Sequence, residues 1–401
     1  MALMPVEDAR ARILQGARRC AAESVRLADG LGRVLATPVK AIRDQPPFEA
    51  SAMDGFAVKA NDVAAVPASL KVIGISAAGH GFKGHVTSGE AVRIFTGAPL
   101  PRGTDAVVIQ ENTSTPAPSQ VTILQQVRPS QNVRTRGLDF ERGEMLLTAG
   151  TRLNARDIGL AGAANAGLVR VVRKPLVAVF ATGDELVAPG GRPNADQIVS
   201  SNSQALVALV RHFGGEPLDL GIVPDKLKAT ERTIARAAGA DILVTTGGAS
   251  VGDHDFVQQA LKNAGVKIDF WKIAMRPGKP FMYGRKGRQH MMGLPGNPVS
   301  ALVCARLFLK PLIDAMLGLP AGDDLVLARL GAPMKANDDR QDYVRATLRS
   351  EPDGTRTATP HMKQDSSMQR TFQQSDCLIV RPPGAPEAAA GLLVPILKID
   401  F

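Results

Sequence analysis

The sequence predicts a multidomain protein of α/β and β structure, organised around a doubly wound α/β domain. Strand and helix patterns alternate along residues 175–320, as they do in doubly wound sheets. Short apolar and β-branched runs separated by Gly and Pro fill residues 69–126 and again 321–401, which indicates two β-rich regions. A chain of 401 residues with 44% hydrophobic content can bury the cores of several such domains.

Charge and hydropathy limit the classes of molecule that this protein is expected to bind. The chain has 48 basic and 38 acidic residues, and its net charge of +10 suits nucleic acid or a small anion. The basic residues are scattered and aromatics make up only 4%, so we expect small anions and no nucleic acid. No apolar run reaches the roughly 20 residues of a membrane span, and the N-terminus lacks a signal peptide's apolar core. We therefore expect a soluble cytoplasmic protein with no membrane partner.

The cysteines and histidines show no metal-binding spacing. Cys20, Cys304 and Cys377 lie far apart without a Cys-x-x-Cys pair, which argues against a disulfide framework, a zinc site or an iron–sulfur cluster. The six histidines form no HExxH-type pair. Any transition metal that this protein handles is therefore not expected to be held by protein thiolates.

The N-terminal half begins with helical spacing over residues 5–19, followed by short extended pieces over 27–42. Residues 43–58 (RDQPPFEASAMDGFAV) then present Asp54 at a loop tip between two phenylalanines. A carboxylate on such a pinned loop suggests function, but Asp before Gly is also the commonest turn pair. Both interpretations stay open from the residues alone.

A small β-rich module follows, with Thr96 at the end of one of its strands. Asp139 lies in the charged loop 134–144, for which a solvated turn is the alternative interpretation. Asn154 is expected to cap a helix over 155–164, and a strand follows at 169–172. The β-rich module is therefore expected to be inserted between the N-terminal helix and this returning segment.

The central stretch of the α/β region is residues 241–255, DILVTTGGASVGDHD. Its apolar, β-branched start predicts a buried strand, and a new helix is expected near Phe256. The loop between them combines glycines with hydroxyls, a geometry that holds anionic ligands at a helix N-terminus. A tight turn in which Asp253 or Asp255 only caps the helix is the alternative.

Other polar residues of the α/β region fall just after predicted strands or in the following loops. They are Asp184, Glu185, Asp225, Thr246, Ser250, Asp255, Lys279 and Asn297. Because the carboxyl ends of parallel strands share one edge of the sheet, we expect these side chains to converge there. Several carboxylates facing a phosphate-type loop suggest a hydrated Mg²⁺ that bridges protein and substrate phosphates. The region 321–401 shows no catalytic constellation.

Nine motifs follow one another over nearly the whole length of the chain: PPFEASAMDGFAV, RIFTGAPLP, the 134–139 loop, ATGDELV, SNSQAL, GIVPD, TTGGASVGDHDF, MRPGKPF and GLPGNPVSAL. With these motifs in this order, the chain resembles the MoeA family, the molybdopterin molybdenumtransferases. It implies a Mg²⁺-dependent enzyme that inserts molybdenum from molybdate into adenylylated molybdopterin and releases AMP. The dithiolene of the substrate supplies the soft sulfur ligands, so no cysteine cluster is needed.

The resemblance also implies an elongated homodimer whose subunits have four domains. These are a linker and dimerisation domain (1–45 and 139–174), an inserted β-rich domain (46–138), a doubly wound MoaB/Mog-like domain (175–320) and a small C-terminal β-barrel domain (321–401). A molybdopterin adenylyltransferase would supply the substrate, and molybdoenzyme maturation proteins would accept the product.

The roles of individual residues follow from the same resemblance. Catalytic roles fall to Asp54, Asp139, Glu185, Asp225, Asp255, Lys272, Arg276 and Lys279, and Mg²⁺ would be held by Asp184, Glu185 and Asp255. Substrate would be bound by Thr96, Thr182, Gly183, Ser203, Thr246, Gly247, Gly248, Ser250, Gly252, Pro295, Gly296, Asn297 and Ser300. The N-terminal group of Asp54, Thr96 and Asp139 would close the cleft from the partner subunit.

Two positions depart from the family pattern. Arg276 stands where many members carry Lys, which replaces a point charge by a planar fork. Asp365-Ser366-Ser367 replaces a loop that is often Gly-Ser-Gly, and its extra carboxylate argues against anion binding there. Two alternative functions are an adenylyltransferase or nucleotide pyrophosphatase with the same α/β domain, and a scaffold without chemistry. The first leaves SAMDGFAV unexplained, and the second leaves the acidic set unexplained.

Overall fold

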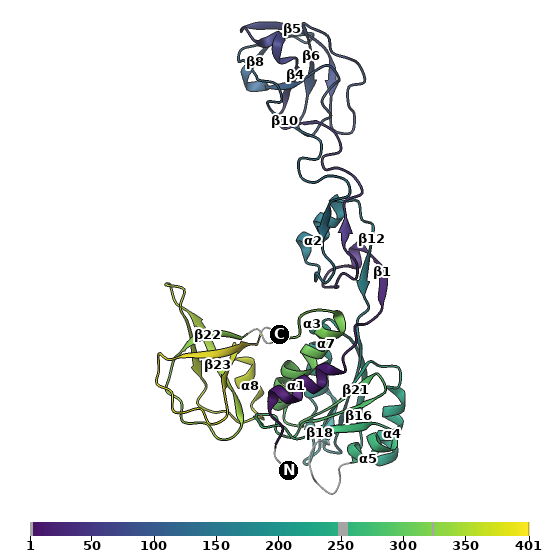
Figure 1. Cartoon of the computed structure of the whole chain (residues 1–401), viewed down its shortest axis with the longest axis vertical. Coiled ribbons are helices and arrows are strands. Elements are labelled where there is room, and N and C mark those ends of the chain that lie inside the picture. The colour runs from purple at the N-terminus through teal and green to yellow at the C-terminus, as the bar shows by residue number, and fades with distance from the viewer. Residues whose placement is uncertain (1–2, 248–255, 323–324, 400) are drawn as a thin grey trace. The chain divides into compact units, whose positions relative to one another are not determined.

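The computed structural model of the chain describes residues 3–247, 256–322, 325–399 and 401 (Figure 1). It forms two compact units, one made of Ser24–Val171 and the other of Met1–Glu23 together with Val172–Phe401. The second of these contains the α/β domain and the C-terminal β domain. No helix in the described ranges has the length and apolar character needed to cross a membrane.

The α/β domain is built on a six-stranded sheet in the order β16-β13-β17-β21-β20-β18. Its parallel strands are β13 (Leu176–Thr182), β16 (Glu216–Val223), β17 (Ile242–Thr246) and β21 (Gln289–Leu294). The antiparallel strand β20 (Met282–Lys286) forms a hairpin with β21 and also pairs with β18 (Lys267–Trp271). Every residue of β17 is buried because helices cover both faces of the sheet. The predicted doubly wound domain is confirmed.

The register of the sheet aligns the strand ends that were predicted to carry the site. Phe180 pairs with Thr245, Thr245 with Gly293, Gly293 with Met282, and Met282 with Trp271. These residues form one row across the sheet, one or two positions before β13, β17 and β21 end. The loops that follow these three strands therefore leave the sheet at the same edge.

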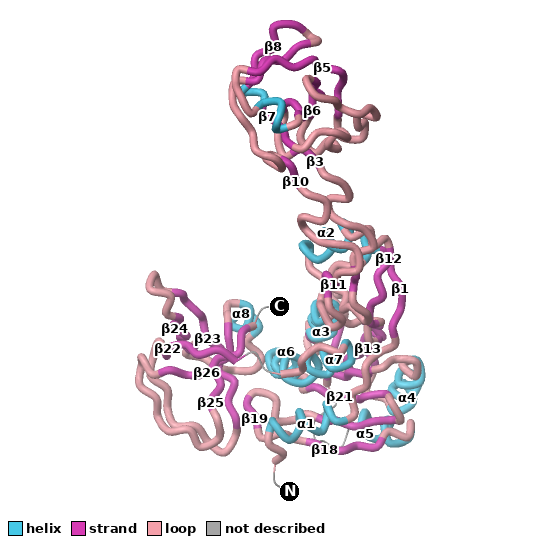
Figure 2. Tube along the Cα trace, turned by 45° about the horizontal axis from the view of Figure 1, so that its top comes forward, coloured by secondary structure: helices cyan, strands magenta, loops and turns pink. Residues whose placement is uncertain are grey.

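Helices cover the two faces of this sheet (Figures 1 and 2). On one face, α4 (Leu227–Arg236) and α5 (Phe256–Asn263) pack on a core that includes Ala178, Phe180 and Leu243. The remaining helices are α1 (Val6–Gln15), α3 (Asn202–Phe213), α6 (Pro298–Cys304), the π-helical segment η4 (Ala305–Leu309) and α7 (Lys310–Leu317). Helix α3 contacts β13 and β16 and also packs on α6 and α7.

Helix α1 is shorter than the helix predicted over residues 5–19. It ends at Gly16, where a Cβ would overlap the Arg285 guanidinium. Its buried residues Val6, Ala9 and Ile13 lie on one side, spaced three or four apart, and the helix contacts α7 and η4. The first helix of the chain is thus part of the α/β unit.

A buried histidine lies in β21 below this helix. The Tyr283 hydroxyl is 2.9 Å from His290 Nδ1, and His290 is only 1% exposed. Burial, aided by the nearby Arg285 charge, lowers the pKa of His290 from 6.5 to about 4. The folded protein therefore keeps this imidazole neutral in a pH range where the unfolded chain would protonate it.

We expect this histidine to make the protein acid-labile. Because the folded-state pKa is the lower one, stability present above pH 6.5 is lost as the pH falls towards about 4, by at most about 3 kcal/mol. A His290→Asn variant should be less stable at pH 7 but should lose less further stability between pH 7 and 4.5. Urea unfolding at both pH values measures this, with the exposed His212→Asn as control. Equal losses in wild type and His290→Asn would contradict it.

The Ser24–Val171 unit contains a six-stranded sheet in the order β7-β4-β6-β5-β9-β8. Its strands are β4 (Gly55–Val58), β5 (Ala68–Ser76), β6 (Glu90–Ile94), β7 (Ala106–Ile109), β8 (Thr113–Ala117) and β9 (Gln120–Ile123). Beside it are the two-stranded pairs β10 (Val133–Arg134) with β3 (Ala50–Ser51), β11 (Met145–Leu147) with β2 (Val39–Lys40), and β1 (Ala22–Arg26) with β12 (Leu168–Val172). The predicted cap is confirmed, because Asn154 and Asp157 form a capping box at α2 (Ala155–Ala163).

The C-terminal domain is a small closed barrel. Its strands are β22 (Leu325–Leu330), β23 (Gln341–Ser350), β24 (Arg356–Pro360), β25 (Cys377–Arg381) and β26 (Leu393–Lys398). The order β23-β24-β22-β26-β25 closes on itself because β25 also pairs with β23. A short helix, α8 (Gln369–Gln373), lies in the connection before β25. The predicted C-terminal β-barrel is confirmed, although the sequence analysis did not predict β24.

Candidate active site

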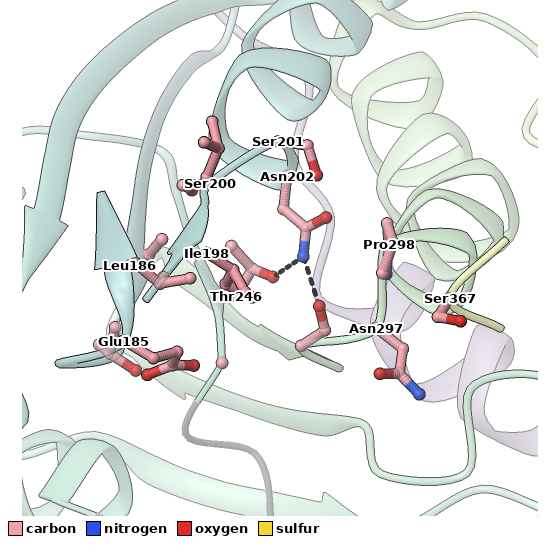
Figure 3. Close-up of a pocket in the computed structure, with 15 residues that line it drawn as sticks. Glu185, Leu186, Ile198, Ser200, Ser201, Asn202, Thr246, Asn297, Pro298 and Ser367 are labelled. Atoms are coloured by element: carbon pink, nitrogen blue, oxygen red, sulfur yellow. Dashed lines mark hydrogen bonds between the residues drawn. The ribbon is translucent and has the colours of Figure 1, made fainter. Parts of the chain in front are cut away.

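A cavity of about 390 Å³ lies where β13, β17 and β21 end (Figure 3). It is lined by Ala181, Thr182, Glu185, Leu186, Ile198, Val199, Ser200, Ser201, Asn202, Thr246, Gly247, Gly296, Asn297, Pro298 and Ser367. Six of the predicted site residues therefore meet at one pocket: Thr182, Glu185, Thr246, Gly247, Gly296 and Asn297. A cleft at the carboxyl ends of parallel strands is the usual ligand site of such sheets.

Glycines at two strand ends give this edge of the sheet its shape. Gly247 follows β17 with a left-handed φ of 83°, and a Cβ there would overlap the carbonyl oxygen of Thr182. A Cβ at Gly183 would overlap the Glu185 carboxylate. The loop after β17 can therefore approach the end of β13 closely only because Gly247 lacks a side chain.

A hydrogen-bond network joins three elements below the pocket (Figure 3). Asn202, the first residue of α3, donates from Nδ2 to Thr246 Oγ1 at 3.0 Å and to the Gly296 carbonyl at 2.7 Å. The Thr246 hydroxyl in turn donates to the Pro295 carbonyl at 3.1 Å. The sequence analysis selected Ser203 from the SNSQAL motif, whereas Asn202 of the same motif lines the pocket. Ser203 is buried one residue further along, with its Oγ 3.5 Å from Ser200 Oγ.

One side of the pocket is apolar. Strand β14 (Leu186–Val187) pairs with β15 (Ile198–Val199), and both strands contribute to the lining. Ile198 is 59% exposed, so its side chain is accessible from solvent on this side of the pocket. This apolar side faces a polar floor, so the pocket suits a ligand with both apolar and polar parts. Sequence reasoning missed Leu186, Ile198 and Val199.

The predicted carboxylates lie at the ends of β13 and β16. Glu185 lines the pocket, and the preceding Asp184 accepts a hydrogen bond through Oδ1 from the Asp225 amide at 3.1 Å. No cluster of three or more potential metal-ligating side chains occurs within the described ranges. Asp184 is not among the described residues that line the pocket, and that Asp184 and Glu185 hold Mg²⁺ stays a prediction.

A loop of the C-terminal barrel forms part of the pocket wall. Asn297 Nδ2 donates to Ser366 Oγ at 2.7 Å, and the Val299 amide at the start of α6 donates to the Ser366 carbonyl at 3.0 Å. Gln369 Nε2 donates to Ser201 Oγ at 2.8 Å, and Ser367 lines the pocket. The barrel therefore contributes to the site, although its sequence showed no catalytic constellation.

The extra carboxylate of this loop is used within the loop itself. Asp365 Oδ1 accepts hydrogen bonds from Ser367 Oγ at 2.6 Å and from the Ser367 amide at 2.8 Å. These bonds lower the pKa of Asp365 and hold it as a carboxylate. Its position stabilises the turn that brings Ser366 to α6, which is a structural role for this departure from the family pattern.

The predicted cations lie in the segment between β18 and β20 and do not line the pocket. Lys272 has a left-handed φ of 72°, and its Nζ is 5.7 Å from the centre of the Trp271 ring. The backbone of Lys279 accepts hydrogen bonds from the amides of Ile273 and Phe281. That these lysines bind substrate anions stays a prediction.

Arg276, the third cation, connects the α/β domain to the barrel. It lies in β19 (Met275–Arg276), which pairs with β23, and its guanidinium bonds to Asp342. The same guanidinium reaches Asp338 Oδ2 and Asn337 Oδ1, each at 3.3 Å. Asp342 is only 7% exposed, and burial raises its pKa although the bond to Arg276 opposes this. The planar fork of arginine can hold three acceptors at once, which lysine's single ammonium does less well.

The Arg276–Asp342 ion pair is only partly buried, because the Asp342 side chain is 11% exposed and the Arg276 side chain is 49% exposed. An Arg276→Met variant should lose about 2 kcal/mol of unfolding free energy, because it leaves Asp342 buried without its partner. The double variant Arg276→Met, Asp342→Leu should recover most of that loss, since the uncompensated charge is gone. Chemical denaturation of the wild type, the two single variants Arg276→Met and Asp342→Leu, and the double variant gives the four unfolding free energies of this double-mutant cycle. A double variant as unstable as Arg276→Met alone would contradict it.

In the Ser24–Val171 unit, Asp54 and Thr96 are held together. Asp54 Oδ1 accepts hydrogen bonds from the Thr96 amide at 2.7 Å and from Thr96 Oγ1 at 2.8 Å. Both bonds lower the pKa of Asp54, so its side chain is a fixed carboxylate. Asp139 is exposed, and its amide donates to the Gln45 carbonyl at 2.9 Å. The roles predicted for these three residues stay predictions.

Several predicted residues lie elsewhere. Gly248, Ser250, Gly252 and Asp255 lie outside the described residues, as does the alternative cap Asp253. Pro295 takes part through its carbonyl oxygen, and Ser300 is buried in α6.

The three thiols are free and not suited to metal binding. Burial raises the pKa of Cys20 to about 11 and of Cys377 to about 12, and it also raises the pKa of the fully buried Cys304. Protonated thiols are poor metal ligands. A transition metal handled at this site would need its sulfur ligands from the substrate.

The fold and the pocket define a multidomain α/β protein with a cavity of small-molecule size at the carboxyl ends of its parallel strands. Three family models cover the chain: the MoeA N-terminal region (domain I and II) over residues 4–165, a probable molybdopterin binding domain over 178–315, and the MoeA C-terminal region (domain IV) over 327–399. The chain therefore belongs to the MoeA family, as its motifs suggested.

Individual relatives agree with this assignment. A molybdopterin molybdenumtransferase of Nostoc is 41% identical over 327 residues, which are 79% of this chain and 75% of the relative. The Bacillus subtilis molybdopterin molybdenumtransferase is 32% identical over 405 residues, covering 99% of this chain and 94% of the relative. A crystal structure of the molybdopterin biosynthesis MoeA protein of Pyrococcus horikoshii superposes with a TM-score of 0.84 at 30% identity, covering 99% of both chains.

Proposed function

We propose that this protein is a molybdopterin molybdenumtransferase: it takes molybdate and adenylylated molybdopterin, inserts molybdenum into the dithiolene, and releases AMP and the molybdenum cofactor. The observation that carries the proposal is the pocket at the ends of β13, β17 and β21, in a chain whose family and full-length relatives have this activity. Its apolar side and polar floor match a substrate that joins a pterin ring to phosphates.

Different residues of the pocket contact different parts of the substrate. Leu186 and Ile198 contact the planar ring system, and the backbone amide of Gly247 at the end of β17 donates to phosphate oxygens. Asp184 and Glu185 would hold Mg²⁺, and the ion would supply neutralisation of the phosphate charge. Molybdenum takes its sulfur ligands from the dithiolene, since the three thiols are protonated and largely buried.

We further propose that the protein acts as a homodimer in the cytoplasm, where its free cysteines stay reduced. Large apolar side chains are exposed on the Ser24–Val171 unit, among them Ile42, Leu138, Met145 and Leu168. Burying some of these side chains against a second copy would remove apolar surface from water, which would stabilise a dimer. A molybdopterin adenylyltransferase supplies the substrate, and molybdoenzyme maturation proteins accept the product.

The proposal is tested by incubating the protein with adenylylated molybdopterin, molybdate and Mg²⁺. AMP and dithiolene-bound molybdenum should appear in equal amounts, and omitting Mg²⁺ should slow both. AMP release that does not depend on molybdate would instead indicate a nucleotide pyrophosphatase. Substrate binding without AMP release would indicate a scaffold.

A further inference from the structure

We propose that Asn202 is a positioning residue for this reaction: its carboxamide fixes the two loops that form the floor of the pocket. The inference rests on the proposed function and goes beyond it, because it assigns a role to a residue that the family motif analysis passed over. Asn202 is 9% exposed and lies where α3 meets the ends of β17 and β21 (Figure 3).

The orientation of the carboxamide follows from its neighbours. The Gly296 carbonyl can only accept a hydrogen bond, so the group 2.7 Å from it must be the amide nitrogen. Thr246 Oγ1 gives its own proton to the Pro295 carbonyl and therefore accepts the second Nδ2 proton. Both protons of one nitrogen are thus committed, one to the loop after β21 and one to the end of β17. The carbonyl Oδ1 is buried and accepts no hydrogen bond from the described residues.

This arrangement fixes more than one wall of the pocket. Thr246 is followed directly by Gly247, whose left-handed backbone turns the chain into the loop after β17. Gly296 is followed by Asn297, which bonds to Ser366 of the barrel. A single carboxamide therefore sets the spacing between the glycine turn and the segment that receives the barrel loop. Misplacing catalytic geometry by about 1 Å can cost on the order of 100-fold in rate, so this spacing matters for turnover.

The nitrogen is the essential part of the side chain. Asn202→Asp keeps the shape but removes both N–H donors and places a carboxylate against the Gly296 carbonyl. We expect kcat/KM for AMP release at pH 8 to fall about 100-fold in this variant. Burial beside a carbonyl raises the pKa of the new carboxyl, and its protonated form regains one O–H donor. The activity of the variant relative to wild type should therefore rise as the pH is lowered from 8 to 6.

Three further proteins complete the test. Thr246→Val removes the bridging hydroxyl without adding charge and should lose about 10-fold in kcat/KM, and the double variant should be no worse than Asn202→Asp, because both act in one network. Gln204→Glu makes the same amide-to-acid change at an exposed position of α3 and should match the wild type. All assays are run well below the unfolding temperature of each variant.

Wild-type turnover in this assay tests the proposed function. The activities of the variants relative to the wild type test the role of Asn202, so the two proposals can fail separately. The positioning role is supported if kcat/KM falls by the predicted factors in the variants and if the relative activity of Asn202→Asp rises as the pH is lowered. Wild-type kcat/KM in both Asn202→Asp and Thr246→Val would overturn it while leaving the transferase function intact. Multiplicative losses in the double variant, or a loss in Asn202→Asp that does not change with pH, would also overturn it.

Discussion

A Glu185→Gln variant is expected to release AMP at least about 100 times more slowly than the wild type while unfolding at nearly the same temperature. Glu185 is a charged residue lining the pocket, and its carboxylate folds over Gly183 at the end of β13. The amide keeps the size and one acceptor oxygen but removes the charge that would hold Mg²⁺. An exposed side chain at this edge contributes little to the core, so stability should be retained.

Single-turnover AMP release over a range of Mg²⁺ concentrations measures this effect. The variant should need more Mg²⁺ than the wild type to reach its maximal rate, since one carboxylate ligand is lost. Glu216→Gln is a suitable control, because Glu216 lies at the start of β16, outside the pocket lining. Identical rates and Mg²⁺ dependence in wild type and Glu185→Gln would remove Glu185 from the proposed metal site.

The second large effect is expected for Asp54→Asn. The amide oxygen can still accept the two hydrogen bonds from Thr96, so the loop should keep its structure while the negative charge disappears. We expect turnover to fall on the order of 100-fold if this carboxylate contributes to the reaction through the partner subunit. Thermal unfolding checks that the fold is intact, and Asp62→Asn offers a control carboxylate in the same sheet unit.

Mixed dimers test where Asp54 acts. When Asp54→Asn and Glu185→Gln chains are co-expressed in equal amounts, half of the dimers contain one chain of each variant. If each site takes Asp54 from one subunit and Glu185 from the other, one of the two sites in such a dimer carries neither substitution. About a quarter of wild-type activity should then return, which follows from the symmetry of a twofold dimer. No recovery in verified mixed dimers would place Asp54 and Glu185 in a site formed by one chain.

The sequence predicted the part of the site that depends on strand ends. Buried runs such as β17 break at glycine, and parallel strands bring their carboxyl ends together, so Thr182, Thr246 and Gly247 could be placed at one edge without coordinates. Glu185 and Asn297 followed from the same rule, whereas Gly296 was predicted from the family resemblance. The fold class could also be predicted from the sequence. Alternating strand and helix patterns indicate the α/β domain, and short β runs without helices between them indicate the β-rich regions.

The rest of the site depends on contacts that leave no local pattern. Strands β14 and β15 have two residues each, too few to show a periodicity, so Ile198 appeared in no prediction. Ser367 reaches the pocket from the barrel through packing against α6. The sequence identifies Arg276 as a cation but does not indicate that Asp342 is its partner. Only the structure reveals that these two residues join the α/β domain to the C-terminal barrel.

The proposed function requires adenylylated molybdopterin to bind in the pocket at the ends of β13, β17 and β21. A crystal structure of the Glu185→Gln variant soaked with this substrate tests the requirement, because the variant should bind the substrate but turn it over slowly. We expect electron density for the ring system beside Leu186 and Ile198 and for phosphate near Gly247. A fully occupied substrate bound elsewhere, with this pocket empty, would contradict it.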